Sequence, residues 1–241
     1  MTIDITLVVI TVGGFIAAFV NAAFATGGVY IVLLSSISVL PITAAIQLQA
    51  AFSASSLFGR VFFFWKDIDW TIVSTFALGC LVGVGLGTVT FANLPDQLIS
   101  ILLGFVLLLM IWLPKLPKAP RLKRPFMYIG VVHSYISAIF GVGGILQPAI
   151  LRTDLRKDVI TGTLAACMVA MEAMKVSGYL SIGFNYANYI PHIICANIAG
   201  VLGVWAGKRV THLISEQTFR TFFKIFVSLV ALRLIWRGLI G

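Results

Sequence analysis

Two glycine-rich sequences in this chain have the residue types needed to bind an anion. Thr26-Gly27-Gly28 and Gly141-Val142-Gly143-Gly144 each follow one apolar stretch and precede another. The first turn of a helix has backbone N–H groups without intrahelical partners and a partial positive charge. If helices begin at Gly28 and Gly144, these first turns can bind a small anion, because glycine lets an oxygen atom approach the backbone. A tight turn between packed helices needs the same glycines, so both interpretations stay open.

A second group of polar residues recurs at helical spacing after the first glycine pair. Gln49, Ser53, Ser56 and Arg60 are separated by four, three and four residues, which places them on one helical face, with Gln47 close to it. Polar groups within a membrane-spanning helix usually face the interior of a helix bundle. We expect this face to line a path for a solute, although hydrogen bonds between helices require the same residue types.

Glu172 and Lys175 lie one helical turn apart within the apolar stretch 159–182, so they can form a local ion pair. A charge at the centre of a membrane-spanning helix costs about 2.5 to 3.5 kcal/mol on insertion scales, which favours a functional reason for both residues. We expect Lys175 to attract an anion and Glu172 to carry a coupled proton. Both lie in the later half of the stretch, so snorkelling to the membrane surface is the alternative.

A small polar residue precedes each glycine tip, with Asn21 in the first copy and Ser137 in the second. His133, His192 and Asn197 have no evident partner, and we interpret them as buried packing residues. The residues that we expect to contact a solute are Asn21, Thr26, Gly27, Gly28, Gln47, Gln49, Arg60, Ser137, Gly141, Gly143, Gly144, Gln147, Thr163 and Lys175.

The sequence lacks the motifs of an enzyme, a metal site or a cofactor site. It contains no HExxH and no GxSxG, and Gly207-Lys208 is followed by Arg209 without the spaced glycine of a Walker A motif. Cys80, Cys167 and Cys195 are isolated within apolar stretches, which indicates neither a disulfide framework nor a metal site. We therefore expect a protein that is not an enzyme and has no cofactor.

The composition is typical of a membrane protein. Of the 241 residues, 60% are hydrophobic and 10% are charged, whereas a soluble domain has about 25% charged residues. About 20 apolar residues cross the bilayer core as a helix, and the strict alternation of a β-barrel is absent. We therefore predict an all-α integral membrane fold. The long apolar stretches are 5–35, 42–65, 70–92, 98–113, 126–151, 159–182 and 222–235.

The chain contains two copies of one unit. Phe24–Gly28 aligns with Phe140–Gly144, and a set of small residues spaced by four aligns between the same two halves. Such spacing lets helix backbones approach closely in lipid. We predict a first transmembrane repeat over 1–113, a basic cytoplasmic linker over 114–125 and a second transmembrane repeat over 126–241. The small residues are Gly79, Gly83 and Gly87 in the first copy and Ala199, Gly203 and Gly207 in the second.

Loop charges favour an inverted arrangement of the two repeats. The loop 35–41 has no basic residue while its copy, 152–157, has three, and Lys66 lies in a loop whose copy, 183–188, has none. Inverted repeats explain this alternation, because each loop and its copy face opposite sides. With five crossings in each repeat, the linker and most basic loops share one side, which is the cytoplasmic one. We predict about five helical segments in each repeat, and both termini in the periplasm.

Five crossings require the chain to turn back at each glycine tip. The segment from Gly28 to Leu40 has 13 residues, or about 20 Å of helix, which is shorter than the bilayer core. We therefore predict a broken-helix hairpin with a Gly-Gly tip inside the membrane in each repeat. Irregular backbone is tolerated at that depth where it lines a cavity or packs against protein.

These features resemble the TauE/SafE family, also called the sulfite exporter or TSUP family. The resemblance rests on Phe24–Gly28 followed by Pro41–Ala45, and on Phe140–Gly144 followed by Pro148 and Val159–Thr163. It implies a secondary transporter, and specifically an exporter, of sulfite, sulfonates or other small organosulfur anions. It also implies the bacterial inner membrane and alternating access at the paired tips. The resemblance does not select one anion.

Other functions stay open beside this one. They are an anion channel or facilitator for another small solute, an intramembrane enzyme, and a membrane scaffold or subunit. The enzyme would need a catalytic set that the sequence lacks, and the loops are too short for a docking domain. The net charge of +9 lies in short loops, so we expect lipid and a small anion as partners and no nucleic acid. Pairing with a second copy, as a homodimer, is left open.

Overall fold

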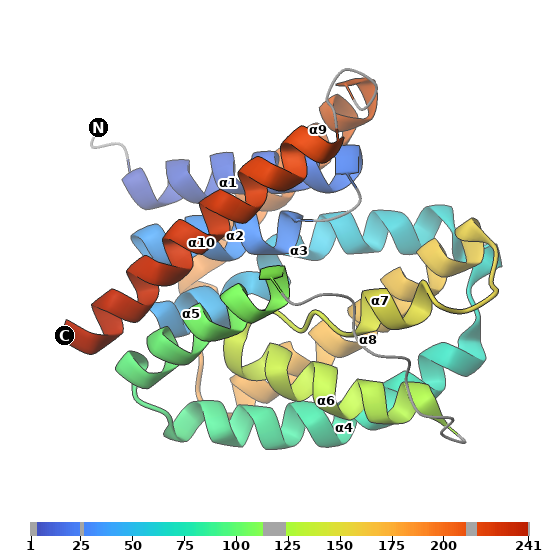
Figure 1. Cartoon of the computed structure of the whole chain (residues 1–241), viewed down its shortest axis with the longest axis horizontal. Helices are drawn as coiled ribbons and strands as arrows, with labels where there is room; N and C mark the ends of the chain where they lie inside the picture. Colours follow the sequence, from blue (N-terminus) through green and yellow to red (C-terminus); the bar gives the residue numbers. More distant parts are fainter. Residues whose placement is uncertain (1–3, 25–26, 113–123, 211–215, 241) are drawn as a thin grey trace. The chain divides into compact units, whose positions relative to one another are not determined.

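The computed structural model describes residues 4–24, 27–112, 124–210 and 216–240, and within these ranges all regular elements are helices. This confirms the predicted all-α fold, with ten α-helices in the described residues (Figure 1). Two short 3-10 helices are η1 (Trp65–Asp67) and η2 (Tyr186–Tyr189). The α-helices are α1 (Ile5–Phe24), α2 (Gly28–Val39), α3 (Ile42–Phe63), α4 (Trp70–Asn93), α5 (Asp96–Trp112), α6 (Pro125–Phe140), α7 (Leu146–Ile150), α8 (Lys157–Ser181), α9 (Ile190–Val210) and α10 (Glu216–Ile240).

Several helices have the length and composition of membrane spans. Within the described ranges, the segments long and apolar enough to cross a bilayer are Ile5–Ala23, Trp70–Asn93, Lys157–Ser181 and Tyr186–Gly207. Their outward faces are apolar too: Leu78, Leu81 and Leu86 on α4 are each more than half exposed. Such faces suit lipid rather than water, so the protein is a multi-pass membrane protein.

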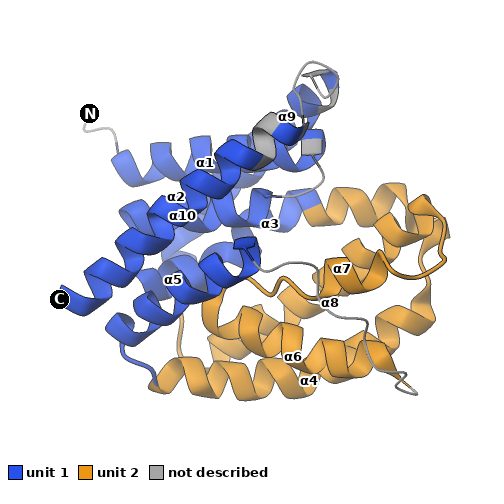
Figure 2. Ribbon diagram, in the orientation of Figure 1, with its two compact units in different colours: residues 1–56, 94–114, 186–241 blue, residues 57–93, 115–185 orange. Residues whose placement is uncertain are grey.

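The chain folds into two compact units, each built from helices of both sequence halves (Figure 2). Unit 1 comprises 1–56, 94–114 and 186–241, and unit 2 comprises 57–93 and 115–185. In unit 1, α1 packs against α2 and α9, and α5 packs against α10; in unit 2, α4 packs against α6 and α8. Each unit therefore pairs the first helix of one half with the fourth helix of the other. This reciprocal pairing is expected of two equivalent repeats, whose orientation stays a prediction.

The glycines at four-residue spacing lie where these helices pack. A Cβ atom at Gly83 of α4 would collide with the carbonyl oxygen of Val131 on α6. A Cβ atom at Gly203 of α9 would collide in the same way with the carbonyl oxygen of Phe15 on α1. The predicted close approach of helix backbones is therefore confirmed at both positions, because only glycine leaves room for it.

The two hairpins differ in the length of their second helix. Helix α2 has 12 residues and begins after Gly27, whose φ is 95°, so the predicted short helix is confirmed in the first copy. Helix α7 has only five residues. The expectation that it begins at Gly144 is wrong, since Gly144 has a φ of 66° and helix α7 begins at Leu146. A left-handed residue cannot continue a right-handed helix, so the loop of the second tip is longer.

Candidate functional site

Unit 2 contains a fully buried lysine, Lys175. Lys175 on α8 has no exposed surface, and its Nζ atom lies 2.9 Å from Oε2 of Glu172, whose side chain is 12% exposed. The same Nζ donates a hydrogen bond to Oγ of Ser137 on α6, at 3.1 Å. The predicted local ion pair is therefore confirmed. The snorkelling alternative fails for Lys175, because its side chain stays inside the helix bundle.

The second glycine tip is held by His133, one turn before Ser137 on α6. Nδ1 of His133 accepts hydrogen bonds from the backbone N–H groups of Ile145 and Leu146, both at 3.2 Å. These are the N–H groups at the start of α7 that the sequence led us to assign to an anion. A neighbouring side chain satisfies them instead.

The glycines of the second tip allow its loop to pack against α6. Gly141 has a φ of 74° and its N–H donates to the carbonyl oxygen of Ser137 at 2.8 Å, which ends α6. Gly143 lies against the ring of His133, since a Cβ atom at position 143 would lie 2.6 Å from both ring nitrogens. Gly144 is exposed. The loop therefore packs on α6 through backbone that only glycine allows.

We refer to His133, Ser137, Glu172 and Lys175 as the polar cluster of unit 2. Residues four apart share one face of a helix, so His133 and Ser137 are neighbours on α6, and Lys175 joins Ser137 to Glu172. The hydroxyl of Tyr179, one turn after Lys175, donates to the carbonyl oxygen of Ala138 at 2.7 Å and fastens α8 to α6. The cluster therefore lies between α6 and α8, which these side-chain hydrogen bonds join.

The first glycine tip belongs to unit 1, and there packing accounts for one of its glycines. A Cβ atom at Gly28 would lie 2.6 Å from the carbonyl oxygen of Ala17 and 2.9 Å from Cβ of Asn21, both on α1. Gly27 is buried and is in the left-handed conformation. Thr26, also an expected site residue, lies outside the described residues. Gly28 thus lets α2 turn back closely along α1.

The first part of the polar stripe on α3, with Gln49 and Ser53, lies in unit 1. Gln49 is 2% exposed, and its Nε2 donates to the carbonyl oxygen of Val29 on α2 at 3.2 Å. Its Oε1 and the hydroxyl oxygen of Ser53 are buried without a hydrogen-bond partner among the described residues. Gln47 is also buried, and its backbone carbonyl accepts from the hydroxyl of Tyr186 at 3.0 Å. Gln49 and Ser53 thus retain acceptor or donor capacity for a polar solute.

Three further expected residues lie in unit 2 outside the polar cluster. Thr163 is fully buried, and its Oγ1 accepts from the backbone N–H of Asp69 at 2.9 Å, immediately before α4. This bond gives Thr163 a structural role at the start of that helix. Arg60, in the last turn of α3, and Gln147, on α7, are both partly buried.

His133 is buried, as expected from the sequence. The sequence did not reveal its partners, which are the two backbone N–H groups of the second tip. The available signal was the spacing His133-x-x-x-Ser137 directly before the glycines. His192, by contrast, lies at the start of α9, and its Nε2 is 3.4 Å from Oδ2 of Asp4.

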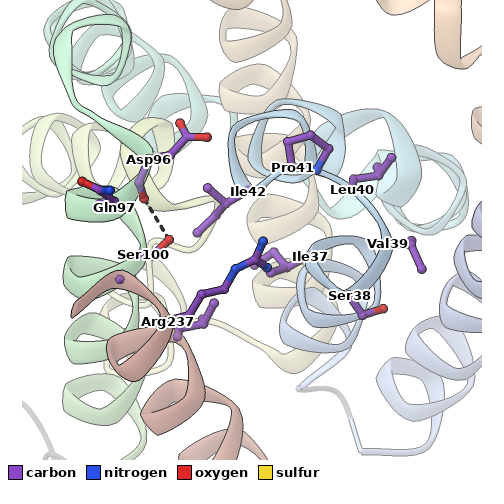
Figure 3. A pocket seen from close by; sticks show the side chains of 12 residues that line it. Ile37, Ser38, Val39, Leu40, Pro41, Ile42, Asp96, Gln97, Ser100 and Arg237 are labelled. Atoms are coloured by element: carbon purple, nitrogen blue, oxygen red, sulfur yellow. Dashed lines mark hydrogen bonds between the residues drawn. The ribbon is translucent and has the colours of Figure 1, made fainter. Parts of the chain in front are cut away.

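A surface pocket of about 460 Å³ opens in unit 1 where three chain segments meet. Figure 3 shows Arg237 extending from α10 toward the turn between α2 and α3, with Asp96 and Gln97 at the start of α5. The ten-segment topology predicts all three segments on the periplasmic side. The lining residues are Ile37, Ser38, Val39, Leu40, Pro41, Ile42, Asp96, Gln97, Ser100, Leu234, Arg237 and Gly238.

Comparison with known proteins identifies the family. The family model described as sulfite exporter TauE/SafE matches residues 10–234, which is nearly the whole chain. Neither the curated proteins nor the solved structures gave a match. The match includes both glycine tips and the polar cluster. The chain therefore belongs to the sulfite exporter TauE/SafE family.

Proposed function

We propose that this protein is a secondary transporter that exports small organosulfur anions, such as sulfite or sulfonates, across the bacterial inner membrane. Family membership supports an anionic substrate, and the multi-pass helical fold suits a transporter. The observation that carries the proposal is the fully buried Lys175 within a candidate membrane span. A cation at that position needs a functional reason, because charges inside the membrane are costly and usually mark a solute path.

The ion pair of Lys175 and Glu172 provides a way to select an anionic substrate. Lys175 is neutralised by Glu172 while no anion is bound, so the empty site carries little net charge inside the membrane. An oxyanion that reaches Lys175 competes with the Glu172 carboxylate for the same ammonium group. Ser137 stays as a neutral hydrogen-bonding partner. The proposed site therefore binds an anion by exchanging one negative partner for another.

This exchange couples the anion to a proton. Once an anion takes the place beside Lys175, two negative groups face one cation, and proton uptake by Glu172 relieves their repulsion. Binding of the anion and of the proton then favour each other, as linkage requires. The proposed transport cycle moves an anion and a proton in the same direction, by alternating access of the two repeats.

Uptake of ³⁵S-sulfite into proteoliposomes tests the function. The wild-type protein should take up sulfite, and Lys175→Met should reduce the rate at least about tenfold, because a hydrogen bond between charged groups contributes about 1.5 to 3 kcal/mol. Lys175→Arg should retain more activity, since it keeps the charge. Lys66→Met replaces an exposed lysine outside the membrane-spanning helices and serves as the matched control.

Other outcomes separate the competing functions. Uptake that does not saturate with sulfite concentration would indicate a channel rather than a transporter. No uptake of sulfite, taurine, thiosulfate or sulfoacetate by a well-folded wild-type protein would overturn the proposed function and favour a scaffold.

A further inference from the structure

His133 has a hydrogen-bond donor that the fold does not use. Its side chain is 4% exposed, and Nδ1 accepts two backbone N–H groups, those of Ile145 and Leu146. A ring nitrogen that accepts hydrogen bonds carries no hydrogen, so the neutral imidazole carries its hydrogen on Nε2. The start of α7 thus selects the tautomer, and Nε2 is an N–H donor.

This donor is buried without a partner. Nε2 of His133 has no hydrogen-bond acceptor within the part of the chain that the structure describes. Leaving a buried donor unpaired is costly, and the interior of a membrane protein offers it little water. The ring is held in place by its two backbone bonds and by Phe76, whose ring centroid lies 6.0 Å away. The donor therefore has a defined position and lacks only an acceptor.

The neighbourhood of His133 suits an oxyanion. Position 143 has no side chain, and a Cβ atom there would lie over the face of the ring, 2.6 Å from each of its nitrogens, so only glycine lets the loop pack against His133. One turn along the same face of α6, Ser137 accepts from Lys175. The titratable groups in the polar cluster besides His133 itself are Lys175 and Glu172, which form a pair.

We propose that Nε2–H of His133 donates a hydrogen bond to an oxygen atom of the transported anion while Lys175 supplies the charge. This inference rests on the proposed function and assigns a further substrate-binding residue to the same site. A neutral imidazole locked in this tautomer donates at Nε2 and has no acceptor left. The site therefore selects ligands that present a deprotonated oxygen, and it disfavours ligands that present an O–H or N–H group in this position.

Two substitutions test the roles of Nδ1 and Nε2 of His133 separately. In His133→Asn, the amide oxygen can take the place of Nδ1 and accept from the start of α7, while no group reaches the position of Nε2. In His133→Gln, the longer amide can present an N–H near the position of Nε2. Sulfite binding to the purified full-length protein is measured by calorimetry, with His192→Asn as the matched control.

Loss of one hydrogen bond to an anion should weaken sulfite binding about tenfold or more in His133→Asn. The unfolding midpoint should stay near the wild-type value, and His133→Gln should bind more tightly than His133→Asn. In protein labelled with ¹⁵N-histidine and carrying no histidine tag, sulfite should shift the Nε2 resonance that is missing from His133→Asn. His192→Asn should bind sulfite like the wild type.

Equal sulfite affinity of His133→Asn and the wild type, with no shift of the Nε2 resonance, would overturn this inference and leave the proposed function intact. A Nε2 that carries no hydrogen in the wild-type spectrum would also overturn it. A wild-type protein that binds none of sulfite, taurine, thiosulfate and sulfoacetate would overturn the proposed function and this inference together.

Discussion

The side-chain oxygen of Asn197 accepts the backbone N–H of Ser55 in the middle of α3, at 2.7 Å. The amide nitrogen of the same side chain donates to the carbonyl oxygen of Ala51 at 2.8 Å. In a regular α-helix, these two backbone groups of α3 bond directly to each other. The amide of Asn197 therefore bridges the N–H of Ser55 and the carbonyl of Ala51 within α3. This bridge lies next to Ser56, the last residue of α3 that belongs to unit 1.

We expect Asn197→Ala to destabilise the protein, because it removes the side-chain amide that bonds to the backbone of Ser55 and Ala51. Two partly buried backbone groups lose their partner, and leaving a buried group unpaired costs about 1 to 3 kcal/mol. Because 1 kcal/mol corresponds to about 2 to 4 °C for a chain of this size, the unfolding midpoint should fall by several degrees. Thermal unfolding in detergent measures it. Asn93→Ala is the control, since the exposed Asn93 donates to the carbonyl oxygen of Val89 in its own helix. Equal midpoints for both variants would show that α3 closes the ladder by itself.

We expect Glu172→Gln to uncouple transport from the proton gradient. Glutamine cannot take up a proton, so a pH gradient that accelerates sulfite uptake by the wild type should have no effect on this variant. Uptake into proteoliposomes with an acidic exterior and an alkaline interior is compared with uptake at equal pH. Asp158→Asn, at the exposed start of α8, should respond like the wild type. The same gradient dependence in Glu172→Gln would remove this carboxylate from the coupling step.

We expect alanine at position 28 to destabilise the first hairpin. The added Cβ atom would lie 2.6 Å from the carbonyl oxygen of Ala17, so α2 must move away from α1. Gly85→Ala is the matched variant, because a Cβ atom there meets nothing within 4 Å. That substitution should raise stability by about 0.5 to 1 kcal/mol through helix propensity. Opposite shifts of the two unfolding midpoints support close packing at Gly28, and a rise in both would contradict it.

We expect the linker and the C-terminus to lie on opposite sides of the membrane. The basic residues of the linker predict a cytoplasmic position for it, and a fifth crossing in the second repeat then predicts a periplasmic C-terminus. Single cysteines at position 118, outside the described residues, and after Gly241 are introduced after Cys80, Cys167 and Cys195 are replaced by alanine. A membrane-impermeant thiol reagent on intact cells should label only the second cysteine. Labelling of both from outside would contradict the ten-segment topology.

The local sequence determined the parts of this protein that depend on neighbours along the chain. Long apolar runs predicted the candidate spans Ile5–Ala23, Trp70–Asn93 and Lys157–Ser181, whereas Tyr186–Gly207 lies outside those runs. The left-handed Gly27 and the later Pro41 explain why α2 is short. The pairing of Glu172 with Lys175 was also predictable, since residues three apart meet on one helical face. The glycines spaced by four indicated where helix backbones approach. Each of these features follows from helical geometry and from the lack of water in the bilayer.

Tertiary structure decided the features that join distant residues. The partners of His133 depend on the loop that brings the N–H groups of Ile145 and Leu146 to its Nδ1. The path of that loop depends in turn on the left-handed backbone of Gly141 and Gly144. Asn197 and Ser55 are 142 residues apart in the chain, and no periodicity relates them. Long-range contacts of this kind are set by which helices pack together. Helical periodicity shows which face of a helix is buried, and only the assembled units determine which side chain that face meets.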